Sequence, residues 1–310
     1  MPRRTPVELH LPLSLLLLCA CSTVPLAGPD AERNLAAAEA AVVANDPDRA
    51  LAELAPLAEE ACPKRLRDRR DLCRALALLA QGERWDAWLI LEKFSDLYPY
   101  SELRPTVVQK VWEIGEALSR SDRGFLFFWS DRRASRTVLE HLVTRHPDSE
   151  HLDDALCILG DQAFDDDNHE LAQRRYRDLM LDRPESEWVG YAQFRFAMSI
   201  VASLEGPNYD LDSMQRGERE LRDYLDGKPE NPEFVATATA ALARLRDWQV
   251  ERHLFVASFY RRVANLPGEL HHLELAAGPA FAGTQRHAEA TALRDEVRAR
   301  ATRTGTWVLP

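Results

Sequence analysis

Hydrophobic positions recur along most of the chain at intervals of three and four residues, which is the spacing of one face of an α-helix. Between Asp153 and Pro184, two such stretches follow each other across an acidic turn at 165–168. Pro184 ends the second stretch, because proline lacks the N–H needed to continue a helix. The pattern predicts two helices packed against each other, followed by a break.

Small residues mark where the two predicted helices approach closely, since small side chains let helix axes come together. The positions that carry this pattern are Leu159, Gly160, Ala163, Ala172, Tyr176, Leu179 and Pro184. The segment resembles a tetratricopeptide repeat at nearly every signature position. Small residues stand where helices A and B of such a repeat cross, large ones where the next repeat packs, and proline where helix B ends.

The same offsets recur elsewhere in the chain. They are found at Ala75, Ala87, Leu91, Phe94 and Pro99; at Gly115, Ser135, Leu139, Leu142 and Pro147; and at Ala197, Gly217, Leu221, Tyr224 and Pro229. In the units that contain Gly115 and Ala197, the insertion between helices A and B is longer. A weaker unit lies around residues 38–57, a degenerate one at 234–281, and a last helix at 284–301. We predict an all-α fold, an α-solenoid of about five to six tetratricopeptide-like helix pairs with a C-terminal capping helix.

Two insertions interrupt the regular turns. Residues 119–133 contain the apolar run Phe125 to Trp129, whose rings either tuck under neighbouring helices or form an exposed patch for a partner. Burial is favoured, because large exposed apolar patches are rare in monomers. Residues 205–212 are polar and contain Gly206 and Pro207, which predicts a loop.

The longest apolar run, Leu9 to Leu18, follows the basic pair at positions 3 and 4 and is too short to span a bilayer. Leu18, Ala20 and Cys21 resemble the lipobox of bacterial lipoproteins, in which the cysteine thiol is acylated and anchors the chain. An ordinary secretory signal with a chance cysteine is the alternative. In the lipobox pattern, Ser22 after the cysteine implies transport to the outer membrane. We expect a signal peptide at 1–20, a lipidated tether at 21–30, the solenoid at 31–302 and a tail at 303–310.

Composition supports a helical protein and argues against nucleic acid as a partner. Leu and Ala dominate, whereas Ile occurs only at positions 90, 114, 158 and 200, so helix formers outweigh β-branched residues. The formal net charge of the 310 residues is −11, which gives no general attraction to a phosphate backbone.

The cysteines other than those of the leader give no metal or redox motif, because no CxxC is present. Cys62 and Cys73 lie eleven residues apart and would be about 16 Å apart on one continuous helix, too far for a disulfide. A break at Pro63 would allow a bridge, but two buried thiols are favoured. Cys157 lies in an apolar helix and is expected in the core.

No catalytic constellation, metal site or cofactor motif rises above background, so we expect a non-enzymatic protein. His141, His146 and His151 are five apart, which does not match the HExxH or HxxEH spacing of helical zinc proteases. Asp165, Asp166 and Asp167 lack the alternation and glycine of a calcium loop; a solvated turn with an aspartate helix cap is expected there. The pair at 271–272 is expected to be exposed.

Residues 135–262 carry a more specific resemblance. Two repeats end in RHPDSE (145–150) and DRPESE (182–187), then come YAQFRFAM (191–198), an insertion, a helix rich in Arg and Glu (215–226), and a long helix from Phe234 to VASFYRR (256–262). This order resembles the middle of the BamD (ComL) family of outer-membrane assembly lipoproteins. Two additional units precede the region, and the residues after Arg262 match only loosely.

The resemblance implies a scaffold on the periplasmic face of the outer membrane, held there by the lipid on Cys21. It would take part in β-barrel assembly by binding the barrel-inserting subunit and, as a second class of partner, unfolded outer-membrane proteins. The two additional units keep open an alternative, a repeat lipoprotein that serves as adaptor in another envelope complex, such as a pilus, a polysaccharide exporter or a peptidoglycan-linked assembly.

The first helix of each repeat also presents a candidate groove for an extended peptide or a partner helix. Projection from the small residues onto that face gives Trp112, Glu116, Ser119, Cys157, Asp161, Phe164, Tyr191, Phe194 and Met198. Aromatic and methionine side chains among acids suit a peptide partner. The alternative for Phe164, Phe194 and Met198 is ordinary packing between adjacent repeats.

Overall fold

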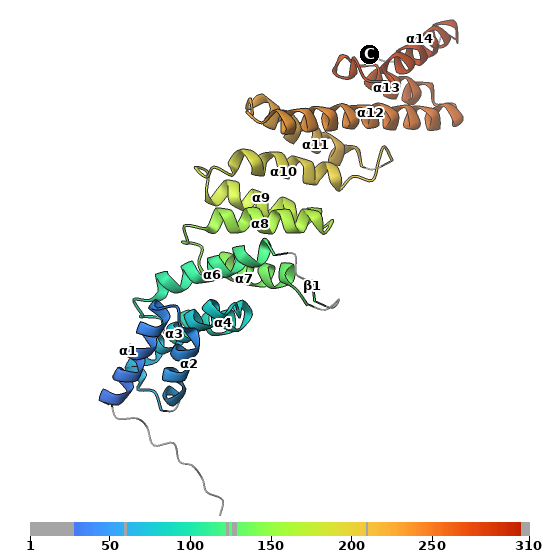
Figure 1. Cartoon of the computed structure of the whole chain (residues 1–310). Coiled ribbons are helices and arrows are strands. Elements are labelled where there is room, and N and C mark those ends of the chain that lie inside the picture. The colour runs from blue at the N-terminus through green and yellow to red at the C-terminus, as the bar shows by residue number, and fades with distance from the viewer. Residues whose placement is uncertain (1–27, 59–60, 122–123, 126–128, 209, 305–310) are drawn as a thin grey trace, which may run out of the picture. The chain divides into compact units, whose positions relative to one another are not determined.

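A computed structural model describes residues 28–58, 61–121, 124–125, 129–208 and 210–304. Helices account for nearly all of its regular structure, and they follow one another as antiparallel pairs (Figure 1). The chain divides into two compact units, residues 1–103 and 104–310, which we describe separately.

The first unit contains two helix pairs. Helix α1 (Gly28–Val43) packs against α2 (Pro47–Leu54), and α3 (Arg67–Gln81) packs against α4 (Arg84–Leu91). The short 3-10 turns η1 (Ala55–Leu57) and η2 (Lys64–Leu66) join the pairs, and the one-turn helix α5 (Phe94–Leu97) ends the unit. Ala50, Ala75 and Ala87, three of the small positions in the repeat pattern, are fully buried.

The second unit begins with three pairs of similar helices. They are α6 (Arg104–Ser119) with α7 (Asp131–Arg145), α8 (Leu152–Asp165) with α9 (His169–Asp182), and α10 (Val189–Ala202) with α11 (Leu211–Asp226). Strands β1 (Gly124–Phe125) and β2 (Trp129–Ser130) pair antiparallel within the first insertion. Whether the aromatic rings of that insertion are buried stays a prediction, because those side chains lie outside the described residues.

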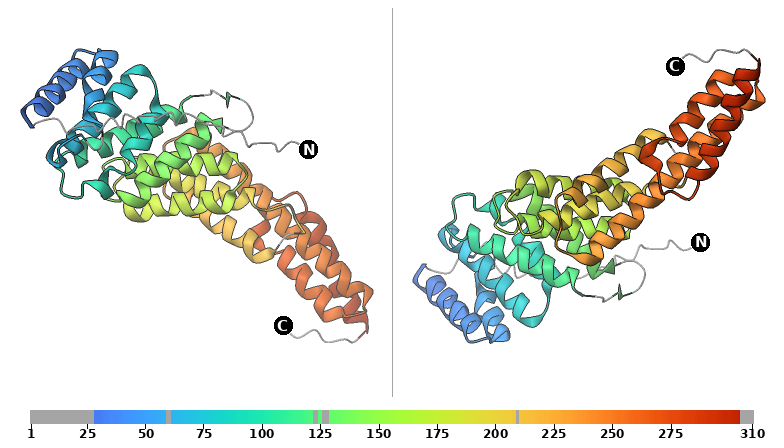
Figure 2. Two further views of the ribbon diagram at one scale, coloured as in Figure 1. Left: turned by 90° about the horizontal axis from the view of Figure 1, so that it is seen from below. Right: turned by 90° about the horizontal axis from the view of Figure 1, so that it is seen from above.

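A fourth pair, made of one long and one short helix, and a last helix complete the second unit. Helix α12 (Pro232–Arg262) has 31 residues and packs against α13 (Leu266–Ala276). The 3-10 turn η3 (Pro279–Phe281) leads to α14 (His287–Thr304), which packs against α13 (Figure 2). The prediction of an α-solenoid built from tetratricopeptide-like helix pairs, with a last helix as cap, is therefore confirmed.

Glycines in α6 and α8 lie where the paired helices cross. A methyl group added to Gly115 would come within 2.5 Å of Cδ2 of Leu139, and one added to Gly160 within 2.6 Å of the ring of Tyr176. Ser135 of α7 donates a hydrogen bond from Oγ to the carbonyl oxygen of Gly115 at 2.9 Å. The crossings are at the positions that the repeat offsets predict.

The turn between α8 and α9 differs from the expectation in one respect. The predicted aspartate cap is wrong, since Asn168 is the N-cap of α9 and its Oδ1 accepts from the backbone N–H of Leu171. Asp167 instead takes a left-handed backbone conformation, at φ 57°. Asparagine can serve as the cap because its amide oxygen accepts a hydrogen bond from the third N–H of the helix, as an aspartate carboxylate also can.

The cysteines of the described segments are three buried, free thiols at positions 62, 73 and 157. The interpretation of Cys62 and Cys73 as buried thiols, and of Cys157 as a core residue, is therefore confirmed. Burial raises the pKa of Cys73 to about 11, so its thiol stays protonated and unreactive at neutral pH.

Within the described ranges, the structure contains no helix of the length and apolar character that a membrane crossing requires.

Candidate functional site

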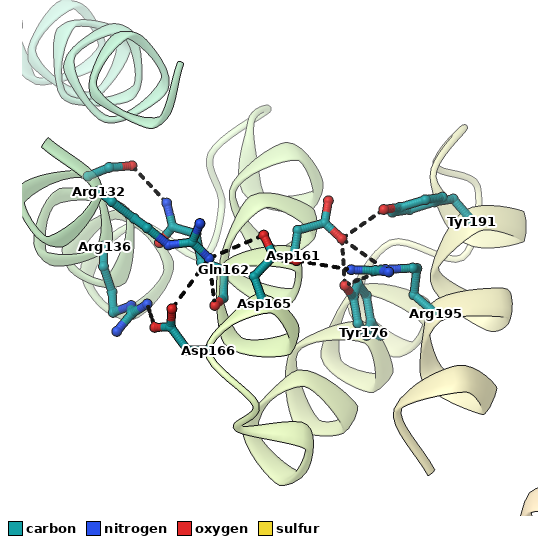
Figure 3. Close-up of polar contacts among 10 residues, drawn as sticks. Arg132, Arg136, Asp161, Gln162, Asp165, Asp166, Tyr176, Tyr191 and Arg195 are labelled. Carbon is teal, nitrogen blue, oxygen red and sulfur yellow. Dashed lines mark hydrogen bonds and ion pairs between the residues drawn. The ribbon is translucent and has the colours of Figure 1, made fainter. Parts of the chain in front are cut away.

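Asp161 is the centre of a polar cluster that joins three consecutive helices of the second unit (Figure 3). Its Oδ1 accepts hydrogen bonds from the hydroxyl of Tyr176 at 2.6 Å, the hydroxyl of Tyr191 at 2.8 Å and Nε of Arg195 at 3.1 Å. These residues come from α8, α9 and α10. The Oδ2 atom has no hydrogen-bond partner among the described residues, and the Asp161 side chain as a whole is 36% exposed.

The two tyrosines act as fixed hydrogen-bond donors. Burial raises the pKa of Tyr176 well above its usual value, and the Asp161 carboxylate raises it further. The same two causes raise the pKa of Tyr191. Both phenols therefore keep their protons at neutral pH and are unsuited to general-base catalysis.

Arg195 completes the cluster on its apolar side. Its guanidinium lies over the ring of Phe164, with Cζ 4.0 Å from the ring centroid, and over the ring of Tyr191 at 5.8 Å. Burial alone would lower its pKa, but hydrogen bonding to Tyr176 and the nearby negative charge outweigh burial and raise it. The side chain thus remains a cation held between a carboxylate and an aromatic face, an arrangement worth about 1–2 kcal/mol when partly desolvated.

The end of α8 makes a second set of contacts toward α7. Arg132 donates from Nη2 to the carbonyl oxygen of Gln162 at 3.0 Å and pairs with Asp165 at 3.3 Å. Arg136 forms an ion pair with Asp166. Asp165 and Asp166 of the α8–α9 turn are therefore bound to arginines of the preceding repeat, whereas the side chain of Asp167 is exposed.

The structure brings together three of the predicted groove residues: Asp161, Phe164 and Tyr191 meet around Arg195. Glu116 lies on α6 in an ion pair with Arg120, and no contact links it to the cluster. Its predicted membership of the same groove stays a prediction.

Three other groove candidates, Trp112, Phe194 and Met198, pack between repeats. Trp112 is buried, and its ring stacks on His151 at a centroid distance of 4.8 Å. Phe194 is buried and stacks on Phe234 at 4.5 Å, while Met198 packs against the same core. These contacts favour the packing alternative for Phe194 and Met198.

The sequence did not single out Tyr176 or Arg195 as site residues, although both are central. Tyr176 stood in the pattern only as the large residue at which repeats pack. Arg195 lies four residues after Tyr191 and so shares its helix face. This spacing was the one sign in the sequence that Arg195 belongs to the site. Their contacts with Asp161 require the packing of three helices.

Replacing Asp161 by Ala is expected to destabilise the second unit by about 1–3 kcal/mol, because it leaves the buried Tyr176 hydroxyl without its acceptor. The measurement is the shift in the urea midpoint followed by circular dichroism. Glu185→Ala is the matched control, since this exposed carboxylate has no hydrogen bond to a described residue. An equal shift in both variants would contradict a structural role for the cluster.

The histidines and acids considered as metal ligands do not converge. His141 and His146 lie ring to ring at 5.7 Å, whereas His151 stacks on Trp112 of another helix. In the described parts of the chain, no three His, Cys, Asp or Glu side chains are grouped so as to hold a metal ion. The prediction that both histidines at 271–272 are exposed is right for His271 only. His272 is partly buried against His253.

Comparisons with known proteins give no family assignment. No protein-family model matches the chain, and no curated protein does. Among solved structures, the tetratricopeptide-repeat domain of P58(IPK) is similar, at 13% sequence identity and a TM-score of 0.29, over 89% of this chain and 67% of that one. A match this distant adds nothing to what the helix pairs themselves show.

Proposed function

We propose that the protein is a non-enzymatic scaffold lipoprotein of the BamD type, anchored by Cys21 at the periplasmic face of the outer membrane. It would take part in the assembly of β-barrel proteins through contacts with the barrel-inserting subunit and with unfolded outer-membrane proteins. Cys21 lies outside the described residues, so the anchor rests on the lipobox resemblance alone.

The observation that carries the proposal is the succession of helices from α7 to α12. Two pairs of ordinary length are followed by a 31-residue helix that ends at Arg262, the order on which the resemblance rests. The polar cluster around Asp161 adds a partly exposed surface of acid, phenol and guanidinium groups within that region. Such a surface suits protein contacts, because it offers hydrogen-bond partners and aromatic faces together.

The test is a crosslinking pull-down of the full chain from a diderm host that processes lipoproteins, with Cys21→Ala as the unanchored control. Recovery of the barrel-inserting subunit with the intact protein, and less of it with the variant, is the expected result. Metabolic labelling with a fatty acid shows separately whether Cys21 carries lipid. Recovery of a pilus, exporter or peptidoglycan-linked complex without the barrel-inserting subunit would overturn the assembly role.

A second candidate is an adaptor of the same architecture in another envelope complex. The observation that favours it is the first unit, whose pairs α1–α2 and α3–α4 precede the region of resemblance. A variant that lacks these pairs separates the two candidates. Loss of a non-assembly complex on their removal favours the adaptor, whereas retained recovery of the barrel-inserting subunit favours assembly.

A further inference from the structure

Helix α12 belongs to two layers of the second unit at once. Its first half packs on α10 and α11, where Ala238, Leu242 and Leu245 join the core that contains Phe194 and Tyr224. Its second half packs on α13 and α14 instead, through residues such as Val250 and Ala257. In Figure 1 this second half extends beyond the ends of α10 and α11. One side of it is therefore left without a covering helix.

That side carries a stripe of apolar side chains, which we call the α12 stripe. It consists of Phe255, Phe259 and Val263, which are 51%, 47% and 54% exposed. A spacing of four residues places them one turn apart on the same face. Single exposed apolar residues are ordinary on protein surfaces, but three in a continuous row form a patch that water does not favour.

Arginines flank the α12 stripe. Arg252 lies over the ring of Phe255, with Cζ 5.7 Å from the centroid, and Arg262 is exposed beside Phe259 along the helix. Neither forms an ion pair with a described residue. Arg252 also acts on Asp210 through space: hydrogen bonds from Ser213 are the main cause that lowers the pKa of Asp210, and the charge of Arg252 lowers it to a lesser extent.

The charge of this face is opposite to that of the whole chain, which carries a formal charge of −11. The third arginine of this helix end, Arg261, pairs with the buried Glu269. The uncovered face therefore presents aromatic rings together with two arginines that form no ion pair with a described residue. A partner with apolar side chains bordered by carboxylates would satisfy both.

We propose that the α12 stripe is a docking site for an acidic amphipathic helix of a partner protein. A row of side chains at every fourth residue is the ridge that packs into the groove of a second helix. Glu or Asp residues beside the apolar face of that helix would pair with Arg252 and Arg262. The site does not depend on the proposed role in barrel assembly, because any partner with such a helix would fit it.

A second copy of this chain fits the stripe less well. A two-fold pairing of the stripe would bring Arg252 and Arg262 close to the same two cations of the other copy, and like charges repel. An anionic membrane also fits less well, because the net negative charge of the protein opposes adsorption and the stripe is only three side chains long. The charge pattern therefore favours an acidic helix.

The test uses the full chain with Cys21→Ala and three labelled helical peptides of about 18 residues, long enough for helix formation. The peptides share one Leu-rich face and differ only in the flanking positions, which are Glu, Gln or Lys. Fluorescence anisotropy measures their binding. We expect the Glu peptide to bind at least tenfold more tightly than the Lys peptide, with the Gln peptide between them.

Two variants place the binding on the stripe. Phe255→Ser with Phe259→Ser should weaken the Glu peptide at least tenfold, and Arg252→Glu with Arg262→Glu should reverse the preference toward the Lys peptide. Leu181→Ser is the matched control, since this lone apolar residue is 71% exposed on α9. Circular dichroism confirms that each variant is folded.

Three outcomes would overturn the proposal. The first is no binding, or equal binding, of the three peptides. The second is stripe-dependent sedimentation with vesicles of anionic phospholipid in place of peptide binding, which would assign the face to a membrane. The third is stripe-dependent self-association in analytical ultracentrifugation, which would assign it to a second copy. The peptide measurements include no barrel-assembly protein. Their outcome therefore tests the α12 stripe alone, and the pull-down tests the proposed role in barrel assembly separately.

Discussion

Replacing Gly160 by Ala is expected to destabilise the protein by about 2 kcal/mol, although Ala is the better helix former by about 1 kcal/mol. The added methyl group would lie 2.6 Å from Cε1 and 2.8 Å from Cζ of Tyr176. That ring is fully buried, and its hydroxyl is bound to Asp161. It can move away only by opening the crossing of α8 and α9 or by giving up the hydrogen bond.

Gly190→Ala is the matched control because the chemical change is the same and the surroundings are not. Gly190 lies in the first turn of α10, and a methyl group added there would have no atom within 4 Å apart from its chain neighbours and the local backbone of its own helix. This variant should be unchanged or more stable by up to about 1 kcal/mol. Urea midpoints of the two variants, measured side by side, decide the matter. A Gly160→Ala protein as stable as Gly190→Ala would mean that the helices do not cross where the structure places them.

Acid is expected to weaken the second unit through the histidine pair between α12 and α13. His253 is only 5% exposed, and its Nδ1 lies 3.2 Å from Nδ1 of His272. The ring of His272 stacks on Tyr260 at a centroid distance of 5.6 Å. Burial lowers the pKa of His253 to about 4, with further lowering by His272, His271 and Arg252.

The sign of the pH dependence follows from whether the unfolded or the folded chain binds the proton at His253. Between the usual histidine pKa near 6.5 and the folded value near 4, the unfolded chain binds a proton at His253 and the folded chain does not. The contribution of His253 to stability is therefore full above pH 6.5, falls as the pH drops through this window, and is lost below pH 4. The loss is at most about 3 kcal/mol, since one pKa unit corresponds to about 1.4 kcal/mol.

His253→Gln tests this assignment, because Gln keeps a hydrogen-bonding side chain but does not titrate. The urea midpoint of this variant should depend less on pH between 6.5 and 4 than that of the unchanged protein. The same replacement at His271, whose ring is exposed, should leave most of the dependence in place. If His253→Gln retains the full slope, the acid sensitivity arises elsewhere.

The repeat architecture was predictable because it depends on side-chain size at fixed offsets. A helix crossing tolerates nothing larger than Gly, Ala or Ser, so Gly115 with Ser135 and Gly160 with Ala172 identify the pairs directly. The cap at Asn168 was not predicted, because an acidic turn offers several side chains able to accept from a helix N–H. Which of them does so depends on the conformation of the turn.

The candidate site was only partly predictable, for a different reason. Helical projection places Asp161 and Tyr191 on one face, and they do meet. The same projection includes Trp112 and Phe194, yet these rings lie inside the protein, because His151 and Phe234 offer them stacking partners. A helical projection predicts on which side of the helix a residue lies, but not how deeply its side chain is buried. Burial depends on which side chains of neighbouring helices pack against it. The stripe on α12 was missed because repeat patterns account for inward residues and ignore the outward ones.

The length of α12 also affects how the array comes apart. In most repeat proteins each unit contacts only its neighbours, so an end unit can fray while the rest stays folded. Here one uninterrupted helix, about 46 Å long at 1.5 Å per residue, supplies core residues to both the layer of α10 and α11 and the layer of α13 and α14. If α13 and α14 unfolded, the second half of α12 would lose its packing, and the first half of this same helix covers the core of α10 and α11. The last two layers should therefore open as one cooperative block, so that the surface around the α12 stripe is rigid even though it lies near the end of the array.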